Sequence, residues 1–177
     1  LNRCAEKLGL EILAYRKVPV NGEGIGKTAL SVEPEMEHVF IACPDHINHP
    51  EDFERKLFLL RNYTSHTVRN TVREDNIGFY IASLSYKTII YKGQLTSGQL
   101  RSYYPDLSNK RLVSAFGLVH SRFATNTFPS WKLAQPFRYI AHNGEINTLQ
   151  GNLNWLKTSE KNFTSPYFSR EEMDMLL

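Results

Sequence analysis

The order of the strands and helices predicted from this 177-residue sequence indicates an α+β fold. Period-two alternation predicts roughly six or seven strands, and helical periodicity predicts about four helices. These elements do not alternate strictly between strand and helix, as a doubly wound parallel sheet would require. Hydrophobic residues make up 41% of the sequence and charged residues 22%, which is the balance of an ordinary globular domain.

The first elements of the chain are short. Residues 2–8 have the pattern of the last turns of a helix that ends at Gly9. Residues 11–18 alternate as a strand, and residues 38–43 form a short apolar run that also predicts a strand. Between them, the Gly-rich residues 21–26 predict a loop.

The longest predicted helix runs from Pro50 to about Thr71. Its first turns carry acidic side chains, which the positive end of the helix dipole favours. A stripe at helical spacing, expected to face the core, consists of Phe53, Leu57, Leu60, Thr64 and Val68.

The remaining predicted elements lie between residues 78 and 157. Alternation and β-branched content support the strands within 78–92. The expected elements are two strands within 78–92 joined near Ser85, a short helix after Thr96 closed by Pro105, a long buried strand over 112–123, a further strand over 137–143, and a helix over 146–157 with Ile146, Leu149, Leu153 and Leu156 on one face.

Charge and composition exclude several classes of function. Lys and Arg number 21 and Asp and Glu 18, so the net charge of +3 is too mild to indicate nucleic-acid binding. No apolar run approaches the roughly 20 residues of a membrane span, and no signal peptide is visible. Two cysteines are not a disulfide framework, so a reducing compartment is expected: the cytoplasm, or a plastid if the source is a plant or alga.

Several motifs have a plainer explanation than a functional site. The NGEGIGKT run resembles a phosphate-binding loop, but Asn21 stands where that motif requires Gly, so a surface loop is predicted. His46 and His49 lack further ligands in a metal-binding pattern, so no metal site is predicted. Cys43 ends an apolar strand and is expected to be a small core residue, while Cys4 is expected to be structural.

The groups best suited to chemistry lie between Gly117 and Trp155. His120, Ser121 and Arg122 end a predicted strand, and an Arg side chain there presents a rigid fork of donors that suits a carboxylate. Thr125 is near enough in sequence to add a hydroxyl. A structural Arg122 paired with a core carboxylate is an equally good interpretation of this segment alone.

The Asn143-Gly144 pair follows a predicted strand and precedes a predicted helix. Glycine permits a close backbone approach, and its N–H together with the Asn amide provides two donors that can form an oxyanion hole. An ordinary turn is the alternative, because Asn-Gly is a common turn pair.

Together, HSRFATNTFPSWKLAQPFR and HNGEINTLQGNLNW resemble the glutaminase domain of glutamate synthases, a class II glutamine amidotransferase and N-terminal-nucleophile hydrolase. LGLEILAYRKVPVN and FYIASLSYKTIIYKGQL extend the likeness over essentially all 177 residues. The resemblance implies a four-layer αββα sandwich. Residues 1–177 would be an internal and therefore partial fragment of it, without the N-terminal nucleophile strand and the C-terminal part.

The resemblance also implies hydrolysis of glutamine to glutamate and ammonia, and transfer of that ammonia to 2-oxoglutarate. Arg122 would bind the substrate α-carboxylate, with Thr125 nearby. Asn143 and Gly144 would form the oxyanion hole. The members of this implied clamp, completed by two flanking histidines, are His120, Arg122, Thr125, His142, Asn143 and Gly144.

Cofactors and partners are likewise implied by the resemblance. No cofactor or metal is expected in this fragment, whereas FMN and an iron–sulfur cluster are expected in the rest of the holoenzyme. The expected partners are glutamine, the remaining domains of the large chain and a small reductase subunit, with no nucleic acid and no membrane.

One departure from the family concerns the nucleophile, which is a cysteine at the mature N-terminus. Leu1 stands first here, and the residues around Cys4 match a later helix of the family, so the fragment is expected to be inactive alone. Asp174 does not match the family's Asp for the substrate amino group. The alternatives are a non-enzymatic binding module on the same fold and an amidotransferase with another ammonia acceptor, which FATNTFPSW disfavours.

Overall fold

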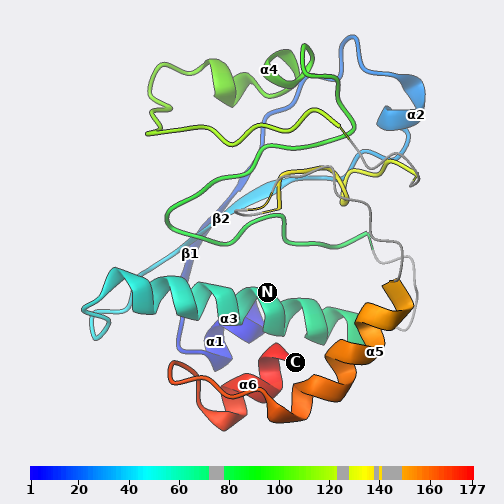
Figure 1. The fold of residues 1–177 in the computed structure, drawn as a ribbon. Coiled ribbons are helices and arrows are strands. Elements are labelled where there is room, and N and C mark those ends of the chain that lie inside the picture. The colour runs from blue at the N-terminus through cyan, green and yellow to red at the C-terminus, as the bar shows by residue number, and fades with distance from the viewer. Residues whose placement is uncertain (72–77, 123–127, 138–139, 141–148) are drawn as a thin grey trace. The chain divides into compact units, whose positions relative to one another are not determined.

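The computed structural model describes residues 1–71, 78–122, 128–137, 140 and 149–177. The chain divides into two compact units. The first contains Leu1–Glu11, Ala42–Tyr86 and Glu145–Leu177, and the second contains Ile12–Ile41 and Lys87–Gly144. Figure 1 follows the chain through both units by residue number. No helix among the described residues combines the length and the apolar character needed to cross a membrane.

The first unit is helical. Its elements are α1 (Asn2–Lys7), α3 (Pro50–Thr71), α5 (Leu149–Ser159), the 3-10 helix η2 (Glu160–Asn162) and α6 (Arg170–Leu176). The long helix α3 packs against α1 and α6. Ser169 begins α6 with a capping box, in which its hydroxyl accepts from the N–H of Glu172 and the Glu172 carboxylate accepts from the N–H of Ser169.

The core of the first unit confirms the predicted stripe on α3 from Phe53 to Thr64, whereas Val68 is only half-buried. Leu57, Leu60 and Thr64 are buried, as is Phe53 at the start of the helix. Glu54 is also buried, and its carboxylate accepts hydrogen bonds from the Ser85 hydroxyl at 2.7 Å and from the Tyr86 N–H at 3.2 Å. These bonds tie α3 to the segment around Ser85 and Tyr86.

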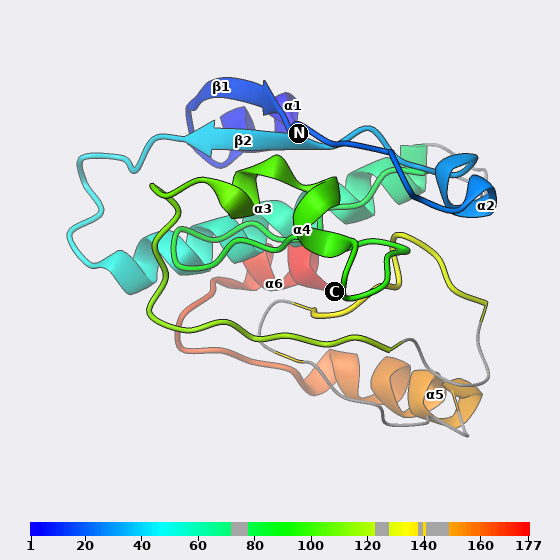
Figure 2. The same cartoon turned by 90° about the horizontal axis from the view of Figure 1, so that it is seen from above.

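The second unit contains the two-stranded sheet. Its elements are β1 (Ile12–Lys17), α2 (Lys27–Leu30), β2 (Glu37–Ile41), α4 (Leu100–Tyr103) and the 3-10 helix η1 (Pro105–Ser108). The antiparallel register places Arg16 opposite His38, with an irregularity between Ile12 and Ala14. Figure 2 shows the two strands side by side from above.

Aromatic rings form the core of the second unit. Tyr103 and Tyr104 pack edge to face at 4.6 Å between ring centroids, and Trp131 lies 5.4 Å from Tyr103. Val18 and Ile25 complete this buried cluster. The short helix α4 ends at Tyr103, just before Pro105, as the sequence predicts.

Several predicted strands are wrong. Residues 78–92 contain no regular strand, and residues 112–122 are irregular and largely exposed, with Val113 86% and Val119 77% exposed. Phe123 and most of 137–143 lie outside the described residues. The two described residues of that range, Phe137 and Ile140, form one isolated antiparallel bridge. Alternation predicts that a segment suits a sheet, but a strand also requires a partner, which single-sequence patterning does not supply.

The described residues contain one sheet of two strands, so they do not display the four-layer αββα sandwich. The helix predicted over 146–157 is present as α5, but its apolar face is not buried: Leu149 is 62% exposed, Leu153 40% and Leu156 47%. Ile146 lies outside the described residues.

Candidate functional site

The structure describes His120 and Arg122 of the predicted clamp. Thr125, His142, Asn143 and Gly144 lie outside the described residues. His120 and Arg122 both belong to the second unit.

His120 and Arg122 are linked through the backbone. The Arg122 N–H donates to Nδ1 of His120 at 3.1 Å. Because Nδ1 accepts this bond, the neutral ring carries its proton on Nε2. His120 is half-buried, whereas the Arg122 side chain is exposed. The exposure of the Arg122 side chain weighs against its interpretation as a cation buried with a core carboxylate. In agreement with this, no ion pair of Arg122 occurs among the described residues.

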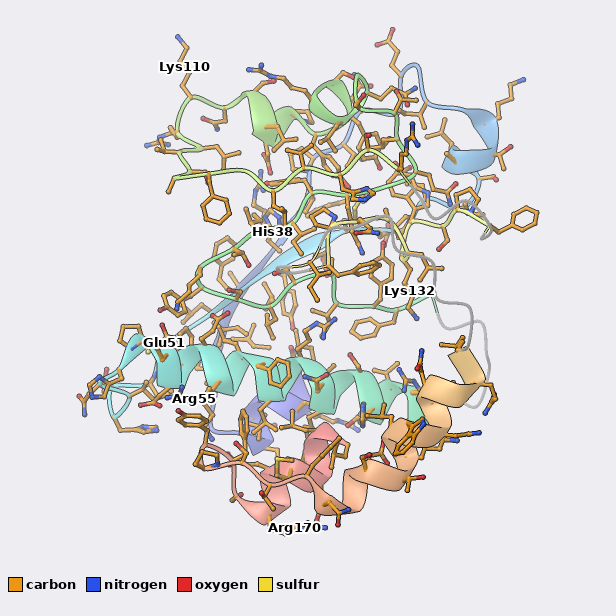
Figure 3. The ribbon with its side chains drawn as sticks, viewed as in Figure 1. His38, Glu51, Arg55, Lys110, Lys132 and Arg170 are labelled. Carbon is orange, nitrogen blue, oxygen red and sulfur yellow. The ribbon has the colours of Figure 1, made fainter. Side chains whose placement is uncertain are left out.

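The segment that separates the two halves of the clamp, residues 128–137, is called the linker below. Trp131 anchors it: its side chain is 3% exposed, and its indole Nε1–H donates to the Ala29 carbonyl at 2.9 Å. The N–H of Leu133 and that of Ala134 both donate to the Ser130 carbonyl, which forms a tight turn around Trp131. Figure 3 labels Lys132 in this turn.

Gly93 allows the Trp131 ring to approach the backbone. A Cβ placed at Gly93 would lie 2.3 Å from Cζ3 and 2.6 Å from Cε3 of Trp131. Real Cβ atoms do not come this close to ring carbons, so only glycine fits here without movement of the ring. The position of the linker therefore depends on the sequence of residues 91–95 as well as on the sequence of the linker itself.

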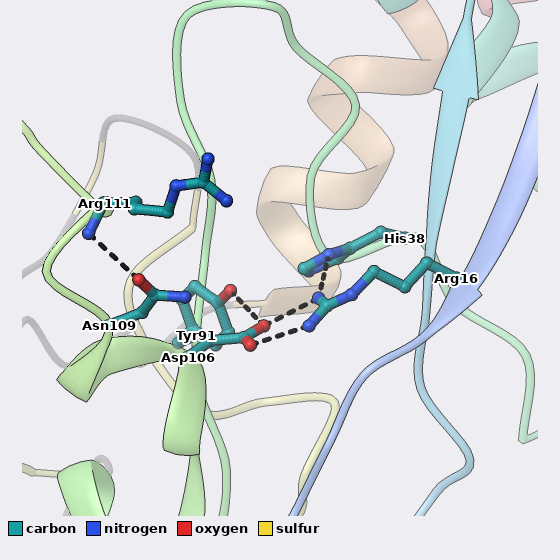
Figure 4. A network of polar contacts seen from close by, with 6 residues as sticks. All are labelled: Arg16, His38, Tyr91, Asp106, Asn109 and Arg111. Carbon is teal, nitrogen blue, oxygen red and sulfur yellow. Dashed lines mark hydrogen bonds and ion pairs between the residues drawn. The ribbon is translucent and has the colours of Figure 1, made fainter.

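A polar network joins the sheet to η1 (Figure 4). Nη1 and Nη2 of Arg16 each lie 2.7 Å from an oxygen of Asp106, which is the two-bonded geometry of a strong ion pair. The Tyr91 hydroxyl donates to the same carboxylate at 2.9 Å. Nη1 of Arg16 is also 3.3 Å from Nδ1 of His38, its cross-strand neighbour.

These contacts shift the ionisation of the network. The hydrogen bond from Arg16 lowers the pKa of Asp106 from 3.8 to about 2. Burial, with the hydrogen bond to Asp106, raises the pKa of Tyr91 to about 12. Burial and the nearby charge of Arg16 lower the pKa of His38. Near neutral pH the network therefore holds one anion, one cation and two neutral rings, which suits a fixed structural joint better than proton transfer.

A cavity of about 290 Å³ lies in the first unit, beside the start of α3. Its cations are already matched by carboxylates: Arg55 lies 2.5 Å from Asp52, and Lys56 lies 3.6 Å from Glu172. The Arg55 guanidinium also covers the Tyr167 ring at 4.4 Å. These pairs account for the charged groups of the cavity without a ligand.

The burial of the two cysteines tests the prediction made for each of them. Cys4 is buried, with Sγ 3.7 Å from the Thr67 hydroxyl, in agreement with a structural role. Cys43 is exposed, so its prediction as a small core residue is wrong: β2 ends at Ile41, and Cys43 already belongs to the following loop. His46 is part of no metal-binding group among the described residues.

Sequence reasoning missed the Arg16–Asp106 joint and the fit of Trp131 against Gly93. Arg16 and Asp106 are far apart in the chain, and no local pattern relates them. The Gly93 position offered a weak signal, because a Gly within a predicted strand often marks a close approach of another group.

Comparison with known proteins adds the family context. The family model described as class-II glutamine amidotransferases matches residues 1–177. The chain is 44% identical over 177 residues to the NADPH glutamate synthase large chain of Bacillus subtilis (strain 168), which covers 100% of this chain and 11% of that protein. It is 46% identical over 179 residues to the NADH glutamate synthase of Schizosaccharomyces pombe, covering 98% of this chain and 8% of that protein.

A third relative carries a different electron donor in its name. The chain is 42% identical over 170 residues to the chloroplastic ferredoxin-dependent glutamate synthase 2 of Arabidopsis thaliana, covering 96% of this chain and 10% of that protein. The chain spans about a tenth of the length of these relatives. The sequence identity of this chain to the three relatives is nearly equal, although their names carry NADPH, NADH and ferredoxin. Sequence identity in this region therefore does not separate the three kinds of glutamate synthase.

Proposed function

Because this chain belongs to the class-II glutamine amidotransferases, we propose that it forms part of the glutaminase domain of a glutamate synthase large chain. In this role it contributes to the hydrolysis of glutamine to glutamate and ammonia. The observation that carries the proposal is the match of the whole chain, at 44% identity to the Bacillus subtilis large chain. The HSRFATNTFPSW and HNGEINT runs lie within that match.

The clamp residues have complementary roles in this proposal. Arg122 binds the α-carboxylate of glutamine, and Thr125 lies beside it. The exposure of Arg122 supports this role, since a free guanidinium fork is what a carboxylate ligand requires. His120 flanks Arg122 and receives its backbone N–H, which leaves Nε2–H of His120 as a donor.

The second half of the clamp acts on the reacting carbonyl. Asn143 and Gly144 supply the two donors of an oxyanion hole, and His142 flanks them. Attack on the amide carbon places negative charge on its oxygen, and fixed donors there lower the barrier more than they strengthen substrate binding. The attacking group is a cysteine thiolate whose own α-amino group accepts the proton.

Neither cysteine of this chain meets that requirement. Cys4 and Cys43 are both joined through their α-nitrogens to a preceding residue, so neither has a free α-amino group. Cys4 is also buried beneath α3. We therefore propose that the 177 residues alone do not turn over glutamine and that the nucleophile comes from another part of the polypeptide.

The ammonia would be used elsewhere in the holoenzyme, where it would condense with 2-oxoglutarate, and FMN and an iron–sulfur cluster would supply the two electrons that reduction to glutamate requires. Two cysteines do not supply the thiolates that such a cluster requires, so the cluster belongs to other domains. A small reductase subunit completes the proposed assembly.

Ammonia release from glutamine tests the proposal directly. The full-length polypeptide that contains this chain should release ammonia, and the isolated 177 residues should not. Turnover by the isolated chain that disappears in Cys4→Ser would overturn the assignment of Cys4. Absence of ammonia release by the full-length protein would overturn the proposed function.

A further inference from the structure

His38 is a titratable residue that the proposed mechanism does not use. It lies on β2, half-buried and directly opposite Arg16 of β1. Its Nδ1 is 3.3 Å from Nη1 of Arg16 (Figure 4). Because a guanidinium carries donors only, Nδ1 must accept this bond, and only the neutral imidazole can do so. The contact is therefore made by neutral His38, with its proton on Nε2.

The same nitrogen of Arg16 also holds the joint to η1. Nη1 donates to Oδ2 of Asp106 at 2.7 Å while it contacts His38. The Tyr91 hydroxyl donates to that same oxygen of Asp106 at 2.9 Å. One guanidinium nitrogen is thus shared between the imidazole and the carboxylate, so a change at His38 acts directly on the bond to Asp106.

The surroundings of His38 disfavour a positive charge on its ring. The titratable and charged groups that face it among the described residues are Arg16 of β1, Asp106 of η1 and Tyr91, whose ring packs edge to face at 5.9 Å. Burial and the charge of Arg16 lower the pKa of His38, and they outweigh the opposite effect of Asp106. Tyr91 remains a neutral donor, since its pKa is raised to about 12. A protonated His38 is therefore more stable when the joint is open.

We propose that His38 is an acid-sensitive switch that releases η1 from the sheet of the second unit. Protonation converts Nδ1 from an acceptor into a donor and sets a second cation against Nη1, so Arg16 cannot keep both of its partners. Asp106 remains ionised over the same range, because its pKa is about 2. The switch acts where η1 leads into residues 110–122, the segment that carries Arg122. The inference goes beyond the proposed function and does not depend on it.

Hydrogen exchange in the full-length polypeptide tests the switch without substrate. The measured peptides cover residues 105–112, where the N–H groups of Leu107 and Asn109 donate to the carbonyls of Tyr104 and Asp106. Exchange corrected for the intrinsic rate gives the fraction of molecules in which η1 is open. We expect this fraction to rise as the pH falls from about 6.5 to about 4, by at most about tenfold per pH unit, because opening takes up one proton.

Two variants identify the groups responsible. His38→Gln keeps a neutral acceptor and removes the titration, so the open fraction should not change between about pH 6.5 and about pH 4. Arg16→Gln removes the repelling cation and leaves His38 faced by Asp106 alone, so the rise should disappear or reverse. His49→Gln is the matched control: His49 is an exposed histidine outside the joint, and its variant should keep the rise of the parent.

Three results would overturn the inference. The first is an open fraction of the parent that stays constant over this pH range. The second is a rise in His38→Gln equal to that of the parent, which would assign the effect to another group. The third is the same rise in Arg16→Gln, which would show that repulsion by Arg16 is not its cause. The parent profile and the Arg16→Gln profile retain the test if His38→Gln does not fold.

Discussion

Arg16 and Asp106 form a two-bonded ion pair that joins the sheet of the second unit to η1. The two N···O distances are each 2.7 Å, and Tyr91 donates a third hydrogen bond to the same carboxylate. Asp106 is largely covered, with its side chain 16% exposed, whereas the Arg16 side chain is 42% exposed. If the Asp106 carboxylate were removed, the donors of Arg16 and Tyr91 would lose their acceptor. This loss is the main energetic consequence of breaking the pair.

Asp106→Asn is expected to lower the free energy of unfolding by about 1–2 kcal/mol near neutral pH, because a charged acceptor of three hydrogen bonds is replaced by a neutral one. The folded pKa of Asp106 is about 2, below its ordinary value of 3.8. The stabilisation is thus complete above about pH 4 and is lost as the pH falls towards about 2. Urea denaturation across this range measures it.

The variant should lose only that part of the pH dependence. The pKa of His38 is also lowered from 6.5, so its own contribution is lost as the pH falls below about 6.5. Asp106→Asn should therefore retain a decline below about pH 6.5 and lack the steeper one between 4 and 2. An unchanged acid limb in the variant would contradict the Asp106 assignment.

Gly93→Ala is expected to destabilise the protein by about 1–3 kcal/mol, because its Cβ would overlap the buried Trp131 ring. The overlap is with ring carbons that are themselves fixed by the Ala29 hydrogen bond and by Tyr103. Thermal unfolding measures the change. Gly98→Ala is the matched control, since a Cβ there meets nothing within 4 Å, and equal losses in both variants would refute the overlap.

The local elements could be predicted from the sequence, because their causes are local. Helix α3 begins at Pro50 and buries the expected stripe of Leu57, Leu60 and Thr64. It could be predicted because the helical spacing of its apolar residues and its acidic first turn both lie within one segment. The strands β1 and β2 and the stop at Gly9, whose φ is 67°, have equally local signals. Boundaries agree with the prediction within a few residues.

The parts that depend on distant partners could not be predicted. Residues 112–122 have the apolar character of a buried strand, yet Val113 and Phe116 are 86% and 75% exposed, because apolar character does not identify a neighbouring strand. The apolar side chains of α5 have the right spacing, but spacing does not determine what covers them. In the candidate site, His120 and Arg122 were found from residue type and order. The contacts of Lys92 and Gly93 could not be predicted, because they exist only where the distant linker packs against these two residues.

Thiol labelling should distinguish the two cysteines. Cys43 is exposed and should react with a disulfide reagent under native conditions, whereas Cys4 is buried and should react only as the first unit opens. One thiol per chain is therefore expected to react promptly and the second to appear with urea. In Cys43→Ser the prompt reaction should disappear, and prompt labelling that survives would show that Cys4 is accessible.

The two halves of the clamp should respond differently to substitution in the full-length polypeptide. Arg122→Ala is expected to raise KM for glutamine by roughly 10- to 100-fold, because it removes charged hydrogen bonds made equally to substrate and transition state. Asn143→Ala should instead lower kcat by about 100- to 1,000-fold, as expected for the loss of one oxyanion donor. Glutamate release at varied glutamine concentration separates the two parameters.

Arg122→Lys provides the matched control for the first half. A lysine keeps the charge but not the planar fork, so it should recover only part of the lost affinity. Full recovery would mean that charge alone matters and that the two-bonded geometry assigned to Arg122 is wrong. A fall in kcat for Arg122→Ala together with a rise in KM for Asn143→Ala would reverse the roles, and the clamp would then have to be reassigned with Asn143 as the carboxylate ligand.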